Sequence, residues 1–251
     1  ILILPSLQVP PGGYQSPEYK GSFWDGSAQS NEWMDQLVNF WTEAGSRYKD
    51  DPTIAAFDLF NEPKPDKDSK WWSLVERMVK AIRKTGFKQP IIVESSFAKD
   101  SKLQLVDDKQ TIYDTHFYDP WEFASGQSGI YNTACLPNEP GVILDKNWIE
   151  KDLIELVLDF AQEHKVPVNI GEYGIAHKAL TNNGLEWLKD LSEVITEHEI
   201  SRQYFTWHTY ADFGIVENPW YREYPIKLYQ PVVDIISTCM SLGLFVSINQ
   251  R

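Results

Sequence analysis

Short apolar runs alternate with longer amphipathic segments along this chain. The runs have the length and continuous hydrophobic character of strands buried on both faces; they cover Ile1–Gln8, Ile54–Phe60, Ile91–Val93, Thr111–Phe117, Val166–Ile170 and Gln203–Trp207. Segments with apolar residues at helical spacing follow them; these include Ser30–Tyr48, Ser69–Thr85, Ile149–Phe160, Leu188–Ile195 and Leu228–Leu242. This alternation predicts six parallel strands connected by crossover helices.

The first two helices carry the clearest signals. Ser30 is the predicted N-cap of the first, and one face collects large side chains at helical spacing: Trp33, Leu37, Phe40, Trp41, Ala44 and Tyr48. In the second, the residues predicted to face inward are Val75, Met78, Val79 and Ile82, and Gly86 is a stop signal.

Polar residues at the strand ends favour a barrel over an open doubly wound sheet. A nucleotide-binding doubly wound fold usually has a glycine-rich turn after its first strand, and the sequence contains neither G-x-G-x-x-G nor G-x-x-x-x-G-K-[ST]. Instead, polar or acidic residues stand at the carboxyl ends of four of the six predicted strands, where a (β/α) barrel gathers its active site; they are Gln8, Glu62, His116 and Glu172. Without a Pro/Gly/Ser-rich linker, residues 1–251 are interpreted as one α/β domain of the TIM (β/α)8-barrel type.

Composition and charge exclude several classes of protein. The chain is 42% hydrophobic and contains no apolar run of about 18 residues, which argues against a membrane span. Its formal net charge of −13 argues against nucleic acid and anionic lipid as partners, because both require a basic surface. Cys135 and Cys239 are too few for a disulfide framework, and whether they pair stays open.

Two glutamates at strand ends point to acid/base chemistry. Glu62 lies in Asn61-Glu62-Pro63, and Glu172 is flanked by glycines in Gly171-Glu172-Tyr173-Gly174. Two carboxyl groups about 5 Å apart can cleave a glycosidic bond with retention of configuration, one as the acid and the other as the nucleophile. The structural alternative is that Glu62 caps a turn and Glu172 is an ordinary loop carboxylate.

Further candidates lie near the same strand ends. His116 and Tyr118 are two residues apart and therefore point to the same side, where either could orient the nucleophile. Trp207 could stack on the apolar face of a sugar ring or pack in the core. The tryptophans predicted on the surrounding rim are Trp24, Trp121 and Trp220. No ligand spacing of the H-x-x-x-H type occurs, so neither a metal nor another cofactor is expected.

These motifs resemble glycoside hydrolase family 5, a family of cellulases, β-glucanases and β-mannanases on (β/α)8 barrels. By that resemblance Glu62 is the general acid/base, Asn61 is a donor to the sugar 2-hydroxyl, and Glu172 is the nucleophile. The resemblance also makes His116 and Tyr118 the sixth-strand pair and Trp207 the eighth-strand platform. It implies a secreted, retaining endo-β-1,4-glucanase first and a β-mannanase second, acting on β-linked oligo- or polysaccharide.

The chain departs from the family pattern at its beginning. Ile1–Gln8 corresponds to the third barrel strand, so the first two strands and the arginine that contacts the nucleophile have no counterpart, and Gln8 stands where the family usually has His. Three explanations stay open: a fragment of a longer polypeptide, a six-stranded barrel that closes or dimerises through its exposed edges, or a substitute strand from Leu244–Ile248. The alternative functions are a catalytically weakened carbohydrate-binding barrel and, less in keeping with the strand-end residues, a scaffold without sugar binding.

Overall fold

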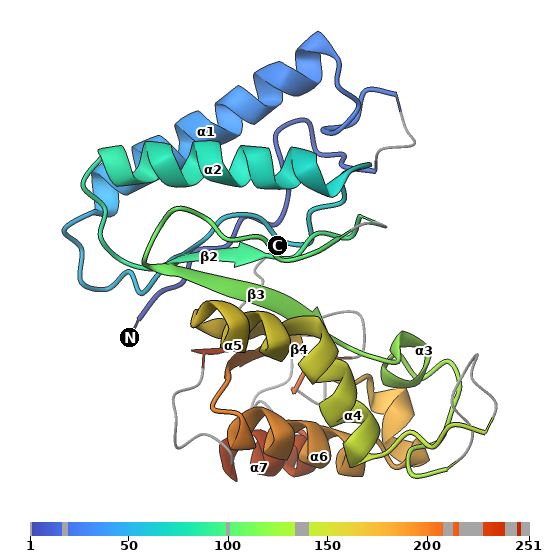
Figure 1. Ribbon diagram of the computed structural model, residues 1–251. Coiled ribbons are helices and arrows are strands. Elements are labelled where there is room, and N and C mark those ends of the chain that lie inside the picture. Colours follow the sequence, from blue (N-terminus) through green and yellow to red (C-terminus); the bar gives the residue numbers. More distant parts are fainter. Residues whose placement is uncertain are drawn as a thin grey trace. The chain divides into compact units, whose positions relative to one another are not determined.

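The computed structural model describes residues 2–16, 20–98, 101–133, 141–207, 213–215, 228–238 and 245–246. They form two compact units (Figure 1), which are considered separately. The first unit comprises Ile1–Asp114 and Phe160–Pro167, and the second comprises Thr115–Asp159 and Val168–Arg251. The prediction of one domain over residues 1–251 stays a prediction. Trp220, Cys135 and Cys239 lie outside the described residues.

Parallel strands form the centre of the first unit. β1 (Phe57–Asp58) pairs with β2 (Ile91–Glu94), which pairs with the first residues of β3 (Thr111–Phe117). The described strand residues of β1 and β2 are all buried, as the continuous apolar runs predict.

The predicted first strand is less regular than expected. Residues 2–8 run parallel to β1, but they form only isolated bridges, from Ile3 to Ile54 and from Ser6 to Asp58. Pro5 accepts a hydrogen bond of 3.0 Å from the amide of Asp58 and has no N–H of its own. A proline in this position prevents a continuous ladder and is typical of an edge strand.

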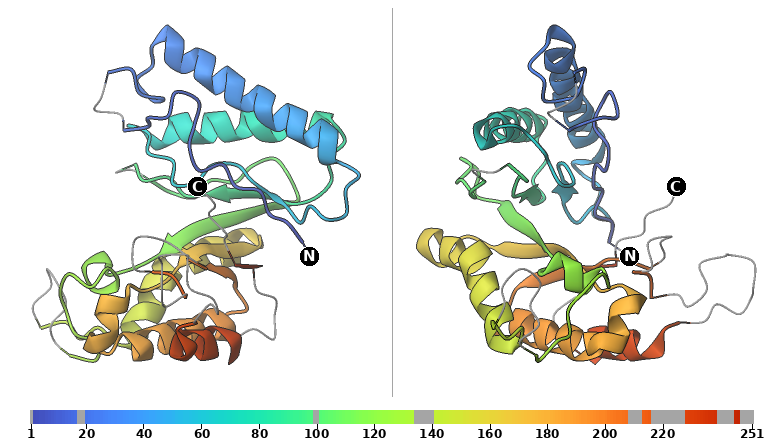
Figure 2. Two further views of the ribbon diagram at one scale, coloured as in Figure 1. Left: turned by 180° about the vertical axis from the view of Figure 1, so that it is seen from behind. Right: turned by 90° about the vertical axis from the view of Figure 1, so that its right-hand side faces the viewer.

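Two helices pack against each other in the first unit, α1 (Ala28–Tyr48) and α2 (Asp68–Lys84), and they lie side by side in both views of Figure 2. The predicted start of α1 is wrong by one turn. The Ser27 hydroxyl accepts a hydrogen bond from the Ser30 amide and is the N-cap, whereas the Ser30 hydroxyl donates to the carbonyl of Phe23.

The predicted inward faces of these helices are confirmed in part. In α2, the four residues predicted to face inward are buried. In α1, Leu37 and Trp41 are buried, but Phe40 and Tyr48 are exposed, because the buried stripe continues through Ser30 and Gly45 instead. Gly45 faces α2, where a Cβ would come within 2.9 Å of the Thr85 hydroxyl, so the small residue permits close helix packing.

The second unit repeats the strand-and-helix order. β4 (Val168–Tyr173) pairs in parallel with β5 (Ser201–Tyr204), and β5 pairs in parallel with β6 (Phe245–Val246). β6 belongs to the run Leu244–Ile248, and its pairing agrees with the alternative in which this run supplies a substitute strand.

The helices described after β3 belong to the second unit, except for residues 160–164, which belong to the first. The segment predicted around Ile149–Phe160 is divided into α4 (Lys146–Leu153), a π-helical turn η1 (Ile154–Leu158) and α5 (Asp159–His164). The other helices are α3 (Trp121–Ala124), the 3-10 helix η2 (His177–Asn182), α6 (Gly184–Glu197) and α7 (Gln230–Thr238). α6 packs against both α4 and α7. In the described part of the chain, no helix has the length and apolar character needed to span a bilayer.

Candidate active site

Asn61 and Glu62 lie three and four residues after the end of β1 in the first unit. The amide of Leu59 donates to Ile92 at 3.2 Å, and the amide of Asn61 donates to Leu7 at 2.8 Å, so the chain is held on both sides as it leaves the strand. Gln8 is the residue after Leu7, is exposed, and donates to the Ser6 hydroxyl at 3.2 Å. Gln8 and Glu62 follow these two neighbouring segments, and they therefore lie at the same end of the unit.

Two residues that were not predicted, Glu94 and Lys64, contact Glu62. The Glu62 amide donates a 2.8 Å hydrogen bond to Oε2 of Glu94, and the Glu62 carboxylate lies 3.3 Å from Nζ of Lys64. The Glu62 and Lys64 side chains are 29% and 46% exposed, so this ion pair is open to solvent. Glu94 carried the same signal as the predicted residues, because it too stands at the carboxyl end of an apolar run.

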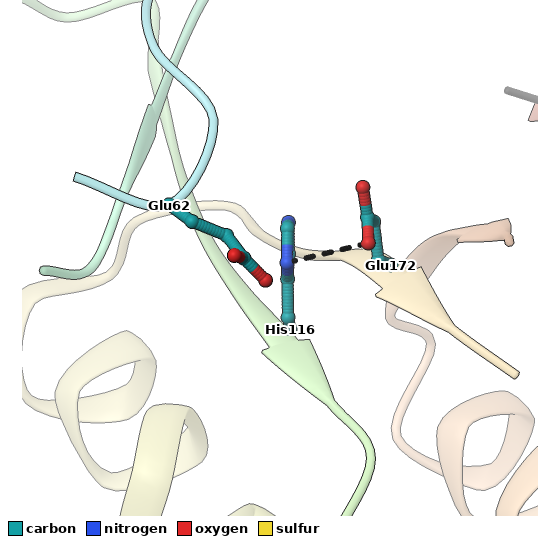
Figure 3. A group of neighbouring side chains, drawn as sticks. All are labelled: Glu62, His116 and Glu172. Atoms are coloured by element: carbon teal, nitrogen blue, oxygen red, sulfur yellow. Dashed lines mark ion pairs between the residues drawn. The ribbon is translucent and has the colours of Figure 1, made fainter. Parts of the chain in front are cut away.

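The second unit builds the environment of Glu172, which lies near the end of β4. The Tyr118 hydroxyl donates a 2.8 Å hydrogen bond to Oε2 of Glu172. Nδ1 of His116 lies 3.6 Å from the same oxygen, and Figure 3 shows this contact as a dashed line. The His116 side chain is 4% exposed and that of Glu172 is 13% exposed. The three residues come from β3, the loop after it and β4, so the structure brings together the group predicted around Glu172.

Aromatic rings adjoin this group in the second unit. Trp121 on α3 is 49% exposed and stacks on Phe213, with ring centroids 6.0 Å apart and an interplanar angle of 9°. Tyr118 meets both rings edge-on, at 5.8 Å from Trp121 and 5.7 Å from Phe213. Trp207, after β5, is 36% exposed. Phe213 was not predicted, because it stands outside every periodic pattern in the sequence.

The prediction of Trp24 on the rim is wrong. Its side chain is 1% exposed and meets Phe23, Phe60 and Trp71 at centroid distances of 4.9, 6.3 and 6.5 Å. Four aromatic side chains thus bury one another in the first unit, and Trp24 presents no ring face to a ligand. Trp220, also predicted on the rim, is outside the described residues.

The environments of Glu172 and Glu62 suit these two carboxyl groups to different chemical roles. Glu172 is held by a tyrosine hydroxyl in a largely buried position, which orients one carboxylate oxygen as a nucleophile requires. Glu62 is a partly exposed carboxyl group that could exchange a proton with solvent or a ligand. In the first unit, carboxylate oxygens of Glu94 and Asp114 lie within 4.8 Å of each other.

Comparison with known proteins identifies the family. The profile of the family described as Cellulase (glycosyl hydrolase family 5) matches residues 18–211. Cellodextrinase A of Ruminococcus flavefaciens is 24% identical over 71% of this chain, which spans only 55% of that protein. Endoglucanase C of Acetivibrio thermocellus is 23% identical over 90% of this chain and 72% of its own length.

Solved structures show the same fold. The endoglucanase Cel5A from the hyperthermophilic Thermotoga maritima has a TM-score of 0.72 at 19% identity, covering 92% of this chain and 71% of that one. A structure of Thermotoga maritima Cel5A in complex with mannotriose has a TM-score of 0.69 at 18% identity, with 92% and 71% coverage. The chain therefore has the α/β fold of these barrels in incomplete form, as predicted. Because the family profile covers most of its length, the chain belongs to glycosyl hydrolase family 5.

Proposed function

We propose that this protein is a retaining β-glycosidase in which Glu172 is the nucleophile and Glu62 is the general acid/base. The observation that carries the proposal is the hydrogen bond from Tyr118 to Glu172, within reach of His116, in a chain of this family. A carboxylate oxygen that is oriented by a phenol and protected from solvent can attack one carbon with a fixed trajectory.

The proposed reaction has two displacements. First, Oε of Glu172 forms a bond to the anomeric carbon while the bond from that carbon to the leaving oxygen breaks, and Glu62 gives its proton to that oxygen. Next, a water attacks the same carbon, Glu62 takes a proton from the water, and the bond to Glu172 breaks. Each step inverts the carbon, so the product keeps the β configuration. This route requires the two carboxyl groups to face each other about 5 Å apart in the working enzyme.

The proposed substrate is β-1,4-glucan, with β-mannan second, and the proposed cleavage is internal. Two relatives are named as an endoglucanase and a cellodextrinase, which favours glucan, and the complex of a structural neighbour with mannotriose keeps mannan as the second choice. Such polymers lie outside cells, so we propose that the protein acts there.

A second copy of the chain is a proposed partner at the edge formed by residues 2–8. Leu2 and Ile3 are 55% and 50% exposed, and an exposed edge of this kind can pair with another chain. Light scattering of the purified protein should give the mass of a dimer. A strictly monomeric mass would reject this partner.

The catalytic proposal is tested with Glu172→Ala on a soluble cellulose derivative. We expect a loss of at least about 10⁴-fold in kcat with the circular dichroism spectrum unchanged, since no other group can form the covalent intermediate. Activated fluoro-sugars should label Glu172, and proton NMR of the first product should show the β anomer. A rate equal to wild type would reject the assignment. Binding of cello-oligosaccharides without any product would favour the weakened carbohydrate-binding protein instead.

Endo-acting cleavage and substrate preference are tested on the wild-type protein. An endo-acting enzyme lowers the viscosity of soluble cellulose well before reducing ends accumulate. Release of reducing ends without a loss of viscosity would contradict internal cleavage. The ratio of kcat/KM on soluble cellulose and on soluble mannan decides between the two polymers.

A further inference from the structure

The backbone of Glu62 has an unusual conformation. Its φ is +46°, in the left-handed region that residues with a side chain seldom occupy. Such a conformation is strained and persists only where surrounding contacts hold it. Lys64 contacts the Glu62 side chain, but that pair is exposed and exposed ion pairs contribute little. The contact that fixes the Glu62 backbone itself is made at its amide.

Glu94 anchors that amide from β2. Its Oε2 accepts the 2.8 Å hydrogen bond from the Glu62 amide, and the residue is only 2% exposed. The β1–β2 register, with Asp58 opposite Ile92, brings the end of one strand beside the end of the other. A buried hydrogen bond to a carboxyl oxygen is shielded from competing water, so it fixes the amide of Glu62 firmly.

Glu94 is itself held rigidly. Its carbonyl accepts a 2.8 Å hydrogen bond from Nε1 of Trp71, which is fully buried. The Trp71 ring packs against Phe60 at a centroid distance of 5.8 Å, two residues before Glu62. The anchor and the segment that it holds thus share one packed support.

We propose that Glu94 is a positioning residue for the acid/base Glu62, acting through the Glu62 backbone amide. The inference rests on the proposed function, because it gives Glu62 its acid/base role. Without the acceptor, the loop relaxes from its left-handed turn and the Glu62 carboxyl group moves relative to the leaving oxygen. A displacement of about 1 Å can cost on the order of 10²-fold in rate, and here the loss falls on proton transfer.

The experiment compares two leaving groups. A sugar leaving group, as in a cello-oligosaccharide, needs a proton from the acid, whereas 2,4-dinitrophenolate from dinitrophenyl β-cellobioside leaves without one. We expect Glu94→Leu, which keeps the volume but lacks an acceptor, to reduce kcat/KM about 10²-fold on the oligosaccharide. On the dinitrophenyl substrate kcat/KM should fall less than about 3-fold, because its first step needs no acid.

Three further variants make the result specific. Glu94→Gln keeps an oxygen acceptor and should restore oligosaccharide activity to within about 3-fold of wild type. Asp68→Asn is the matched control, because Asp68 is a buried carboxylate of the same unit that accepts hydrogen bonds from Ser96 and Trp72 rather than from Glu62. It should affect both substrates equally. If Glu94→Leu does not fold, Glu94→Asp, which withdraws the acceptor by one methylene, should show the same selective loss to a smaller degree.

Equal losses on the two substrates in the Glu94 variants, or no loss in any of them, would overturn the proposal. Failure of the proposed function is recognised separately: the wild-type protein would release neither sugar nor dinitrophenol, and the inference would fall with it. A wild type active on both substrates, with Glu94 variants impaired only on the oligosaccharide, supports the positioning role.

Discussion

The Tyr118 hydroxyl donates a 2.8 Å hydrogen bond to Oε2 of Glu172 across 54 residues of sequence. β3 and β4 both end near this contact, so two parallel strands determine where the donor and the acceptor meet. His116, on the same side of β3, lies 3.6 Å from the same oxygen. The oxygen that would attack the sugar is therefore restrained in direction before any substrate binds.

Removal of the phenol tests this restraint. Tyr118→Phe keeps the ring contacts with Trp121 and Phe213 and removes only the donor. A hydrogen bond to a charged group contributes about 1.5–3 kcal/mol, so kcat/KM should fall about 10- to 100-fold. Tyr131→Phe is the matched control, because Tyr131 donates to Asp190 in the same unit. Full activity in Tyr118→Phe, or an equal loss in both variants, would contradict a specific role for Tyr118.

Trp121 is an exposed aromatic side chain of the second unit. Its ring stacks on Phe213 and the residue is 49% exposed, so we expect it to offer a contact surface to a sugar. Trp121→Ala should raise KM about 5-fold on cello-oligosaccharides, since an aromatic stacking contact contributes on the order of 1 kcal/mol. Trp121→Phe should recover most of that loss. If KM stays constant while the melting temperature falls, the ring only packs the loop and the binding role is wrong.

The sequence predicted the arrangement around Glu172 more fully than the arrangement around Glu62. His116, Tyr118 and Glu172 are titratable or polar side chains at strand ends. Strand periodicity places His116 and Tyr118 on one side, and the parallel order of the strands predicts Glu172 at the same end of the sheet. The Glu94 contact was missed because its partner is a backbone amide, which every residue has and no sequence motif marks. The left-handed φ of Glu62 has no sequence signal either, since Glu is not a residue that favours it.

Errors in the fold have similar causes. Trp24 stands near polar and glycine residues, so its local sequence resembles an exposed loop, yet the adjacent Phe23 and the distant Phe60 and Trp71 bury it. Ser27 and Ser30 are both acceptable caps by residue type, and two hydrogen bonds decide between them: the Ser27 hydroxyl accepts from the Ser30 amide, and the Ser30 hydroxyl donates to the carbonyl of Phe23. Periodicity predicted α2 to within one residue at each end because its buried stripe is regular.

Gly174 allows β4 to approach the segment that leads to Trp207. A Cβ at Gly174 would lie 2.3 Å from the carbonyl oxygen of Phe205, so an alanine must push one backbone away from the other. Gly174→Ala should destabilise the protein by about 2–3 kcal/mol and lower activity. Gly13→Ala is the comparison, because Gly13 has φ +76° but nothing within 4 Å of its Cβ. Its cost should be limited to backbone strain of about 1 kcal/mol. Equal melting temperatures for the two variants would contradict the steric argument.

The ion pair between Arg83 and Asp108 should make the stability of the first unit depend on pH. Nε and Nη2 of Arg83 donate to the two carboxylate oxygens at 2.8 Å each. These hydrogen bonds hold the pKa of Asp108 below its ordinary value, against the opposing effect of burial. A carboxyl pKa that is lower in the folded state stabilises the protein above the unfolded pKa of about 3.9, and this contribution disappears as the pH falls through the folded pKa.

Asp108→Asn tests that dependence. The free energy of unfolding at pH 7, from urea titration, should fall by about 1–2 kcal/mol relative to wild type, because the pair is partly buried and bidentate. The difference should shrink as the pH is lowered from 5 toward 3, since protonated Asp108 no longer accepts as a carboxylate. Glu43→Gln breaks the exposed pair with Arg47 and should change stability by less than about 0.5 kcal/mol at every pH. A difference for Asp108→Asn that stays constant or grows on acidification would show that the stabilisation does not come from the ionised carboxylate.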